Sequence, residues 1–449
     1  MEDASIKGKI VIQGELHLKS PMIIGSGQDE FADIEVIKDS KGNPFIPATS
    51  LTGVISHYFD ENYPERLKEK YQFFGYSRKN DNEKHESFQS AFICHDLHAQ
   101  KALIRIRDGV KIDPSSQTAE DMGKYDFEII EKGAVFDLFW EITIRDIHDP
   151  DTFKQILATM ISPLKEGTLP MGAKTNSGFG KCKLKKLCIS HFDFSKKDDV
   201  FRWLKQDFSK GTPKLDCKPF EPENHNKIFC IEARFAIKSS LIVRSYSEEA
   251  NMPDATSITS NGKYVLPGTS VKGAIRHRAL KILKTLEIDD AQERIYNLFG
   301  DAGKNIVSKK GRVLIEEKNI KMVYPEIQNR IKIDRFTGGT IKTALFNSMP
   351  LWSKDHHDES VTIIIKIRNY KEWEAGLMLH VLKDLWSEDL PIGGEKNIGR
   401  GILKGICACI KWDGKCLKIE TDDDKGLIFS DESHETELNQ FAEKVKVVA

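Results

Sequence analysis

Two aspartates stand at matching places in the two halves of the chain. Asp33 precedes a predicted short strand, residues 34–37, and Asp254 lies 221 positions later in a segment that keeps less of this pattern. A carboxylate beside a displaced nucleotide can deprotonate a ribose 2′-hydroxyl or hold a divalent cation, Mg²⁺ or Mn²⁺, that stabilises a pentacoordinate phosphate. The alternative is an aspartate that caps a turn. Because it recurs, we favour a chemical role, with Asp33 ahead of Asp254.

Cations gather on one predicted helix of the second half, which follows residues 266–268. A basic cluster without acidic residues among its members favours RNA, whereas the alternative is an ordinary solvated helix face. The cluster consists of Lys272, Arg276, His277, Arg278, Lys281 and Lys284.

Hydroxyl side chains open this helix and its counterpart in the first half. Ser270, and Ser50 in the first half, are favourable N-cap residues. A helix N-terminus with such hydroxyls and nearby cations is suited to an RNA phosphate. The first half has Thr52 and Ser56 in place of Lys272 and Arg276, which predicts weaker RNA binding at its helix.

Each half also carries a glycine-rich loop with basic residues. Glycine lets one backbone approach another, and the cations can neutralise phosphate. Phe179 can stack on a base, although a core role for this ring is the alternative. The loop residues assigned to RNA binding are Gly172, Lys174, Gly178, Phe179, Gly180 and Lys181 in the first half and Gly393, Lys396, Gly399, Arg400 and Gly401 in the second.

Other candidate residues have simpler explanations. His57 and His277 occupy matching helix positions, but we favour packing over acid–base chemistry for both. Residues 94–98 (Cys-His-x-x-His) lack the second cysteine-rich half of a zinc site. Residues 73–75 and 298–300 pair apolar side chains with a glycine, which predicts a buried helix end with a C-cap.

These residues belong to one set of motifs that occurs twice in the same order. Pairs of matching residues are 220 or 221 positions apart throughout the chain. Such a constant offset indicates two tandem copies of one fold. The matched pairs include Pro47 and Pro267, Gly53 and Gly273, Ile112-Asp113 and Ile333-Asp334, Leu169-Pro170 and Leu390-Pro391, and Gly180 and Gly401.

The order strand, helix, strand, helix, strand in each copy predicts an α+β fold. It matches a ferredoxin-like (RRM-like) module with long insertions. We expect a first module over residues 1–195, a linker with a short helix over 196–227, a second module over 228–413 and an acidic tail over 414–449. The tail is expected to be partly disordered from about residue 420.

Composition limits the classes of function. The 449 residues carry a formal net charge of -1, so no global basic field indicates nucleic acid, although a balanced total can hide a basic stripe. The eight cysteines form no CxxC pair, and no apolar leader opens the chain. We therefore expect a reduced, cytoplasmic protein without a membrane partner.

Several of these motifs resemble those of the RAMP superfamily. Residues 25–53 resemble its N-terminal signature, and residues 266–276 fit that signature better. The two glycine loops resemble its C-terminal motif, and Arg335, within 333–339, stands in a segment similar to its thumb. The match is most specific to backbone subunits of type III CRISPR effector complexes. Two fused modules resemble the double-module subunit of a subtype D variant.

The resemblance implies an endoribonuclease that acts within a complex. Such proteins polymerise along a guide RNA together with other subunits, and a thumb hairpin kinks the duplex of guide and complementary target RNA. An acidic residue at the position of Asp33 and Asp254 cuts the target strand beside each kink. A 2′-hydroxyl nucleophile predicts a 2′,3′-cyclic phosphate product. We expect thumb hairpins at residues 112–126 and 333–346.

Two other functions remain open. A purely structural scaffold would have the same motifs with chemically silent aspartates. A stand-alone precursor-processing ribonuclease of the same superfamily would use histidine or tyrosine chemistry. The chain has no repeated His/Tyr/Lys group but does have a repeated aspartate, which argues against the second alternative.

Overall fold

The computed structural model divides into two compact units, each built around one of the repeats. The first contains residues 1–106, 126–175 and 179–225, and the second contains 107–125, 176–178 and 226–449. The structure describes residues 5–27, 33–77, 87–113, 116, 118–222, 227–245, 252–300, 310–355, 358–422, 424 and 426–447. Helix accounts for 29% and strand for 40%, so the fold is mixed α+β, as expected.

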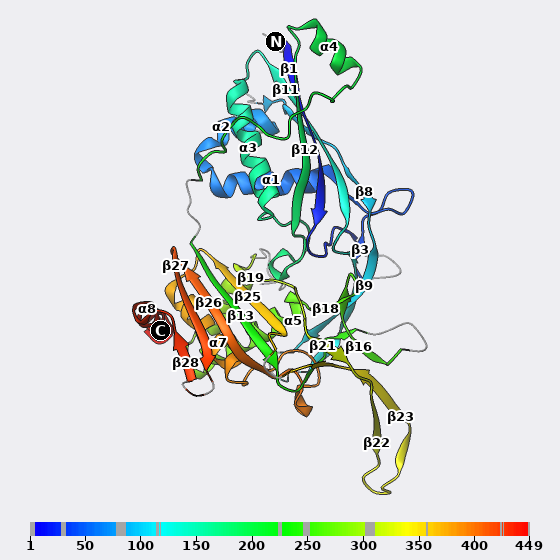
Figure 1. The fold of residues 1–449 in the computed structure, drawn as a ribbon, viewed down its shortest axis with the longest axis vertical. Helices are drawn as coiled ribbons and strands as arrows, with labels where there is room; N and C mark the ends of the chain where they lie inside the picture. The colour runs from blue at the N-terminus through cyan, green and yellow to red at the C-terminus, as the bar shows by residue number, and fades with distance from the viewer. Residues whose placement is uncertain are drawn as a thin grey trace, which may run out of the picture. The chain divides into compact units, whose positions relative to one another are not determined.

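The first unit is organised around an antiparallel sheet with helices packed on its apolar face (Figure 1). The central strand β1 has a largely buried middle, because residues 10–12 and 16 contribute apolar side chains to the core. The main strands in spatial order are β12 (Cys182–Asp193), β1 (Ile6–Leu18), β11 (Val135–Arg145) and, both paired with β11, β7 (Phe92–Cys94) and β8 (Leu97–Lys101). The helices are α1 (Ala48–Asn62), α2 (Leu67–Phe74), α3 (Pro150–Glu166) and α4 (Lys197–Leu204).

The second unit repeats this arrangement with an extended sheet. Its main strands in spatial order are β19 (Val313–Ile315), β25 (Val361–Arg368), β13 (Ile228–Ile237), β26 (Leu403–Trp412), β27 (Lys415–Asp422) and β28 (Gly426–Phe429). The helices are α5 (Gly268–Thr285), α6 (Ala291–Phe299), α7 (Glu372–Trp386) and α8 (Glu432–Val447). Apolar residues of α5, α6 and α7 share one core with these strands.

The strand order identifies the topology of each unit. Numbered along the chain, the four core strands of the second unit lie in the order four, one, three, two: β26, β13, β25, β19. The first unit has the same order in β12, β1, β11 and β7. Antiparallel strands in this order, with a helix after the first and the third, form the ferredoxin-like arrangement that the sequence predicted.

Each unit also has short strands in the segments between the main strands and helices. In the first unit they are β2 (Gly25–Gly27), β3 (Glu35–Val36), β4 (Phe45–Ile46), β5 (Tyr76–Ser77) and β6 (Ser87–Phe88). In the second they are β14 (Ser240–Leu241), β15 (Arg244–Ser245), β16 (Ala255–Ser257), β17 (Thr259–Ser260), β18 (Lys263–Leu266), β20 (Lys318–Asn319), β21 (Val323–Pro325) and β24 (Leu351–Ser353). The 3-10 turns are Pro64–Arg66, Thr175–Ser177 and Lys396–Ile398.

Both segments expected as hairpins are antiparallel hairpins. They are β9 (Ile104–Ile112) with β10 (Ala119–Ile130), and β22 (Gln328–Ile333) with β23 (Thr340–Met349). The second extends away from the rest of its unit (Figure 1), and the Phe336 side chain at its tip is 99% exposed. The tip of the first, residues 107–125, packs within the second compact unit. There Arg107 forms a buried ion pair with Glu317 at 2.6 Å.

The repeated Ile-Asp motif forms the turns of these hairpins. The Asp334 carboxylate accepts hydrogen bonds from the backbone N–H groups of Phe336 and Thr337, both at 2.8 Å. These bonds lower the pKa of Asp334. Asp113 accepts from Ser116 N at 2.7 Å in the same way. The motif therefore recurs because both hairpins need the same aspartate turn.

Two sequence predictions about the helices and the tail are wrong. Pro47 and Pro267 hold the N-cap positions of α1 and α5, so Ser50 and Ser270 lie inside the first turn and cap neither helix. In α1 the Asp96 carboxylate caps instead, accepting from Ala48 N at 2.7 Å. The acidic tail is ordered over its described residues, since β27 and β28 join the sheet and α8 packs on α7.

The predicted helix ends at residues 73–75 and 298–300 are confirmed. Phe73 and Leu298 are fully buried, and Gly75 and Gly300 follow α2 and α6 with φ of 84° and 92°. Only glycine adopts such a φ without strain, so the recurrence of this motif reflects packing and helix termination.

Candidate nucleic-acid interface

The two repeated aspartates have the same local geometry in their respective units. The Asp33 carboxylate accepts a hydrogen bond from Asp126 N at 3.0 Å, and the Asp254 carboxylate accepts one from Asn347 N at 2.9 Å. Both aspartates are exposed. Each carboxylate is therefore held at the base of a hairpin strand, β10 or β23, while it remains open to solvent.

Backbone pairing beside each aspartate fixes this geometry. Ile34 forms a parallel bridge with Phe127, and Ala255 pairs in parallel with Ser348 in β23. Each of these residues lies 221 positions from its counterpart. The structure therefore places Asp33 and Asp254 equivalently, down to the residue that donates to the carboxylate.

The residue beside each aspartate differs between the units. In the first unit it is Asp126, a second carboxylate. In the second unit it is Asn347, whose amide oxygen accepts from Asp254 N at 2.7 Å, so this pair is linked by two reciprocal hydrogen bonds. Sequence reasoning missed both partners, although their separation of 221 positions was the available signal.

The basic helix predicted in the second half is α5. Its first two turns place Lys272, Gly273 and Arg276 on one face, because residues three and four apart are neighbours on a helix. Partial burial and the nearby charge of Arg276 lower the pKa of Lys272 to about 8. The Arg276 guanidinium lies 5.6 Å from the centre of the Tyr296 ring.

The other predicted cations of α5 divide into two groups. Arg278 forms an ion pair with Asp384 of α7, so it joins two helices of the core and does not form part of an open face. Lys281 and Lys284 are exposed. Of the matched histidines, His57 pairs with Glu61 one turn later at 3.0 Å.

Glycine is required in both glycine loops by the protein's own backbone. Gly180 has φ of 75° and Gly401 has φ of 78°, and a Cβ there would lie 1.7 Å from Met171 O and 1.9 Å from Ile392 O. Gly172 and Gly393 likewise have positive φ and close carbonyl neighbours, and Gly178 is buried. Gly399 alone among these predicted residues has open space around its Cβ position.

The first loop places its lysine over an aromatic ring. The Lys174 ammonium group lies 3.7 Å from the centre of the Phe127 ring, and burial lowers the pKa of Lys174 to about 8. Phe179 is 1% exposed and packs against Phe127, which favours the core alternative over base stacking. Lys181 is half-buried.

The second loop has a carboxylate, Glu395, at the position equivalent to Lys174. Arg330 contacts Glu395 Oε2 at 3.0 Å and Arg400 contacts it at 3.2 Å, while Arg244 bonds the other oxygen. Burial opposes ionisation of Glu395, but these cations outweigh it and lower its pKa. Arg400 is 3% exposed, so it is a partner of Glu395 and not the surface cation that the sequence predicted.

This arginine cluster (Arg244, Arg330 and Arg400 around Glu395) still carries an excess of positive charge. Arg244 keeps 45% of its side chain exposed. The buried Nη1 of Arg400 has no hydrogen-bond partner among the described residues. Lys396, next to the cluster, is exposed, as is Arg335 at the hairpin tip. Sequence reasoning missed Arg244 and Arg330 because they come from segments far from the loop, and it missed Glu395 within the loop itself.

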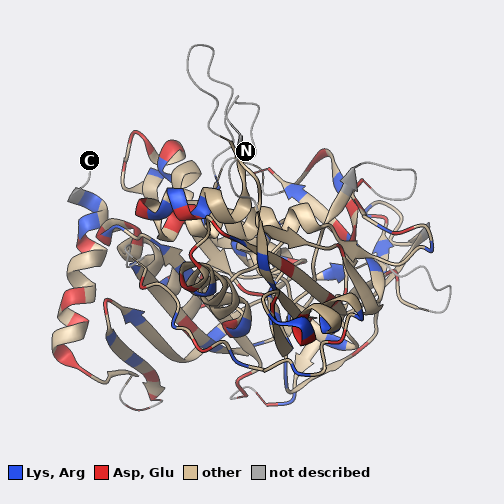
Figure 2. Ribbon diagram, turned by 90° about the horizontal axis from the view of Figure 1, so that it is seen from above, with Lys and Arg blue, Asp and Glu red and all other residues tan. Residues whose placement is uncertain are grey.

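No metal centre is formed by the protein alone in the described ranges. Groups of three or more His, Cys, Asp or Glu side chains that could hold an ion are absent there. His95 and His98 contact Glu141 and Phe45. Charges of both signs are interspersed along the described elements (Figure 2), in agreement with the near-zero net charge.

Comparison with known families identifies the chain. A family model described as "RAMP superfamily" matches residues 15–183 and 234–404, about three quarters of the sequence. This chain belongs to the RAMP superfamily. It is a double-module RAMP protein, and membership of this superfamily implies a CRISPR-associated RNA-binding role. No curated protein matches the chain closely enough to add a relative.

The helices of the structure can also be compared with membrane-spanning helices. Among the helices of the described residues, none combines the length and apolar character needed to cross a membrane.

Proposed function

We propose that this RAMP protein is a backbone subunit of a type III CRISPR RNA-guided complex. In this proposal both modules bind guide RNA, and the subunit cuts complementary target RNA at Asp33 and Asp254, as an endoribonuclease within a cytoplasmic complex with other subunits. Its two fused modules resemble the double-module subunit of a subtype D variant. The single observation that carries the proposal is the equivalent placement of the two exposed carboxylates at the bases of hairpins.

A carboxylate in this place can act on a kinked strand. The hydrogen bond from the hairpin backbone orients one oxygen, and the second oxygen can accept the proton of a ribose 2′-hydroxyl. The resulting 2′-oxygen attacks the adjacent phosphorus, the bond to the 5′-oxygen breaks, and that oxygen takes up a proton from solvent. The products are a 2′,3′-cyclic phosphate and a 5′-hydroxyl end.

The first unit also has the donors for a divalent cation. Mg²⁺ and Mn²⁺ take oxygen ligands, and Mg²⁺ sites commonly combine one or two carboxylates with waters and substrate phosphate. In the first unit the residue hydrogen-bonded to Asp33 through its backbone is Asp126, a second acidic residue, whereas the residue bonded to Asp254 is Asn347. The donor set fits such an ion better in the first unit, where the ion would stabilise phosphate charge.

The grip on guide RNA is assigned to α5 and the arginine cluster. Gly273 is exposed on the α5 face of Lys272 and Arg276, and a Cβ there would meet nothing within 4 Å. Helix packing therefore gives no reason for glycine at this site, whereas close approach of a phosphate backbone does. In the arginine cluster the exposed member is Arg244, which can contact a phosphate oxygen.

A non-catalytic scaffold is the second candidate. It is favoured by the reciprocal bonds between Asp254 and Asn347, since an aspartate whose backbone and side chain both bond a hairpin has a structural role of its own. The scaffold would have the same RNA grip and leave target RNA intact.

The test is cleavage of target RNA by the assembled complex, with product ends identified by mass spectrometry. Asp33→Asn should remove one cut and Asp254→Asn the other, each with a loss of about 10²–10⁴ in rate. The amide preserves the hydrogen bond to the hairpin, so RNA affinity should remain unchanged. Asp113→Asn, in a hairpin turn, is the matched control and should leave both cuts.

Chelation of divalent cations separates the two roles of the carboxylate. Loss of the Asp33 cut on chelation supports a bound ion, and an unchanged rate supports a general base. If both Asn variants cut target RNA like the parent protein, the aspartates neither hold an ion nor act as a base. The non-catalytic scaffold is then the supported function.

A further inference from the structure

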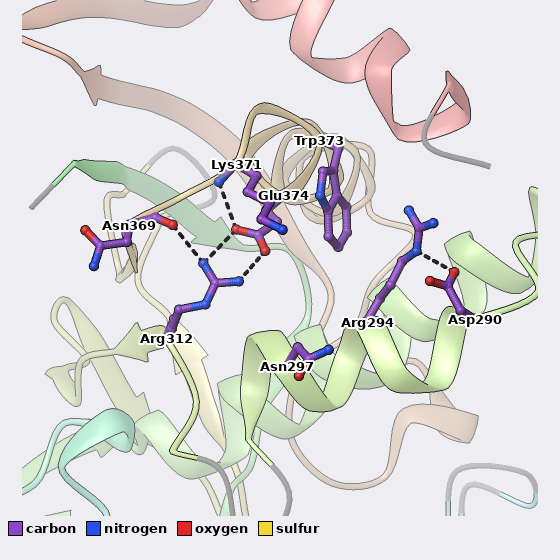
Figure 3. Close-up of a pocket in the computed structure, with 8 residues that line it drawn as sticks. All are labelled: Asp290, Arg294, Asn297, Arg312, Asn369, Lys371, Trp373 and Glu374. Atoms are coloured by element: carbon purple, nitrogen blue, oxygen red, sulfur yellow. Dashed lines mark hydrogen bonds and ion pairs between the residues drawn. The ribbon is translucent and has the colours of Figure 1, made fainter.

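A pocket in the second unit lies outside the surfaces assigned above. It is lined by Asp290, Arg294, Asn297, Arg312, Asn369, Lys371, Trp373 and Glu374, and its volume is about 540 Å³ (Figure 3). The lining comes from α6, the start of β19, the loop after β25 and the N-terminal end of α7. Pockets of this size hold small organic ligands.

Internal ion pairs neutralise most of the charge in this pocket. The Arg312 guanidinium makes a two-bond contact with the Glu374 carboxylate, and its Nη1 also donates to Asn369 O at 2.9 Å. Glu374 further accepts from Lys371 N at 2.9 Å. Arg294 pairs with Asp290. Both arginines are thus partnered, so a simple anion would have to displace a carboxylate.

The rest of the pocket lining consists of an aromatic ring, two uncharged amide side chains and one lysine. The half-buried Trp373 ring has the Arg294 guanidinium 5.2 Å from its centre. Asn297 and Asn369 are exposed and carry amide groups, and Lys371 is an exposed lysine beside them. Figure 3 shows the Trp373 ring and the side chain of Asn297 directed toward the space between α6 and α7.

We propose that this pocket binds one ribonucleotide. An unpaired base stacks on aromatic rings and guanidinium planes and is read by hydrogen bonds to its edges, which Asn side chains can donate and accept. The Trp373 ring and the Arg294 guanidinium provide flat surfaces on which the base stacks. The side-chain amides of Asn297 and Asn369 bond the edges of the base. Lys371 provides a cation for the attached phosphate. The proposal rests on the RNA-binding role of the chain but not on cleavage.

The pocket is separate from the proposed guide-RNA grip. It lies at the N-terminal end of α7, whereas the glycine loop follows the C-terminal end. Fifteen residues of helix separate the two ends by roughly 22 Å. At the offset of 221 positions that relates α3 to α7, the residue equivalent to Trp373 in the first unit is Thr152, which has no ring. The pocket therefore belongs to the second module only.

The test is photocrosslinking of the full-length protein to a short single-stranded RNA that contains 4-thiouridine. Crosslinked peptides are mapped by mass spectrometry. We expect one crosslink within the peptides that contain Asn297 or Trp373, in addition to others at the glycine loops. Trp373→Ala should reduce the pocket crosslink by about tenfold, because stacking provides much of the affinity for an unpaired base.

Matched variants separate stacking from folding. Trp373→Phe keeps a ring and should retain most of the pocket crosslink, and the exposed Asn297→Ala should reduce it without unfolding α6. Trp203→Ala removes another half-buried tryptophan with a cation over it, Lys9 at 4.4 Å, and should leave the pocket crosslink unchanged.

Each result decides the proposal. Competition by free uridine monophosphate would identify a free nucleotide as a sufficient ligand, and resistance would identify a nucleotide within a strand. Crosslinks at the glycine loops but none at the pocket would show that the pocket does not bind a ribonucleotide, and they would remain consistent with the proposed function. A pocket crosslink that Trp373→Ala does not weaken would also overturn it, and no crosslink anywhere would overturn both.

Discussion

The side chains beside Asp33 and Asp254 decide how far the two units can share one chemistry. In the first unit the backbone N–H of Asp126, itself an acidic residue, donates to the Asp33 carboxylate. In the second, the side-chain oxygen of Asn347 accepts from the backbone N–H of Asp254, and the backbone N–H of Asn347 donates to the Asp254 carboxylate. Adjacent carboxylates attract a cation, whereas an amide holds its partner without adding charge.

A residue exchange should transfer this difference between the units. If a cation is held by adjacent carboxylates, Asn347→Asp should make the cut at Asp254 more responsive to Mg²⁺, and Asp126→Asn should make the cut at Asp33 less so. The measurement is cleavage rate at each site against Mg²⁺ concentration. Equal Mg²⁺ responses in parent and exchanged proteins would show that the neighbouring carboxylate has no part in binding the ion.

Lys272 gives the RNA grip a dependence on pH. Its pKa of about 8 means that the side chain is cationic below that pH and neutral above it. A phosphate contact made by the ammonium form is therefore present at neutral pH and lost as pH rises through 8. RNA affinity should fall by roughly tenfold between about pH 7 and pH 9, since a charged hydrogen bond is worth about 1.5–3 kcal/mol.

Arginine at this position is the matched control, because it stays charged throughout this range. Lys272→Arg should flatten the fall in affinity, measured by fluorescence anisotropy. Lys174 has a similar pKa in the first unit, so Lys174→Arg should remove any remaining dependence. An unaltered pH profile in the double variant would assign the titration to other groups.

At the scale of elements, recurring glycines have two different causes. Gly401 closes a loop in which a Cβ would collide with the Ile392 carbonyl, and its φ of 78° disfavours other residues. Gly273 lies in the helix α5 with open space around it. The first glycine is needed by the fold, and we assign the second to the ligand.

Alanine substitutions should separate these causes. Gly401→Ala should lower the free energy of unfolding by more than about 1 kcal/mol, because both φ and contacts are incompatible with a side chain. Gly273→Ala should raise it by about 0.5–1 kcal/mol through helix propensity, yet weaken RNA binding. Urea denaturation and RNA titration of the same variants provide the two readouts. Full RNA affinity in Gly273→Ala would contradict close approach at this helix.

The repeat made the order of elements predictable, but not the contacts between distant segments. The hairpins and the core topology followed from motifs that recur 220 or 221 positions apart, and the helix ends from a motif that recurs 225 positions apart. The cap on α1 could not be predicted, because Asp96 reaches Ala48 from the loop between β7 and β8. The sequence predicts Arg400 as a surface cation, but Arg244 and Arg330 reach its partner Glu395 from distant segments and form a cluster with it. Local patterns contain no information on such pairings.

The order of the acidic tail was hidden by composition. Leu438, Phe441 and Val445 are all buried, and their spacing of three and four residues forms an apolar stripe along α8. Acidic residues at the start of α8 and lysines in its last turn suit the helix dipole (Figure 2). The high charge therefore covers a helix whose other face completes the second core.

At the scale of the whole molecule, two modules share one scaffold but differ in charge. The α1 face carries Thr52 and Ser56 where the α5 face carries Lys272 and Arg276. The strand order and the aspartate geometry are the same in both units. Gene duplication can preserve a fold while each copy changes its surface, and here this predicts unequal shares in RNA binding.

The salt dependence of RNA binding measures those shares. Each phosphate contact that a cation makes releases counterions, with a slope of log affinity against log salt of about −0.7 per contact for single strands. Replacing Lys272 and Arg276 with alanine should therefore weaken binding and reduce the slope by roughly 1.4. Thr52→Ala with Ser56→Ala is the control from the first module, and it should leave the slope unchanged because neither side chain is charged. If the double alanine variant in α5 has the same salt slope as the parent protein, that helix does not contact RNA. The second module must then bind RNA through the arginine cluster, and Arg244→Ala should reduce the slope instead.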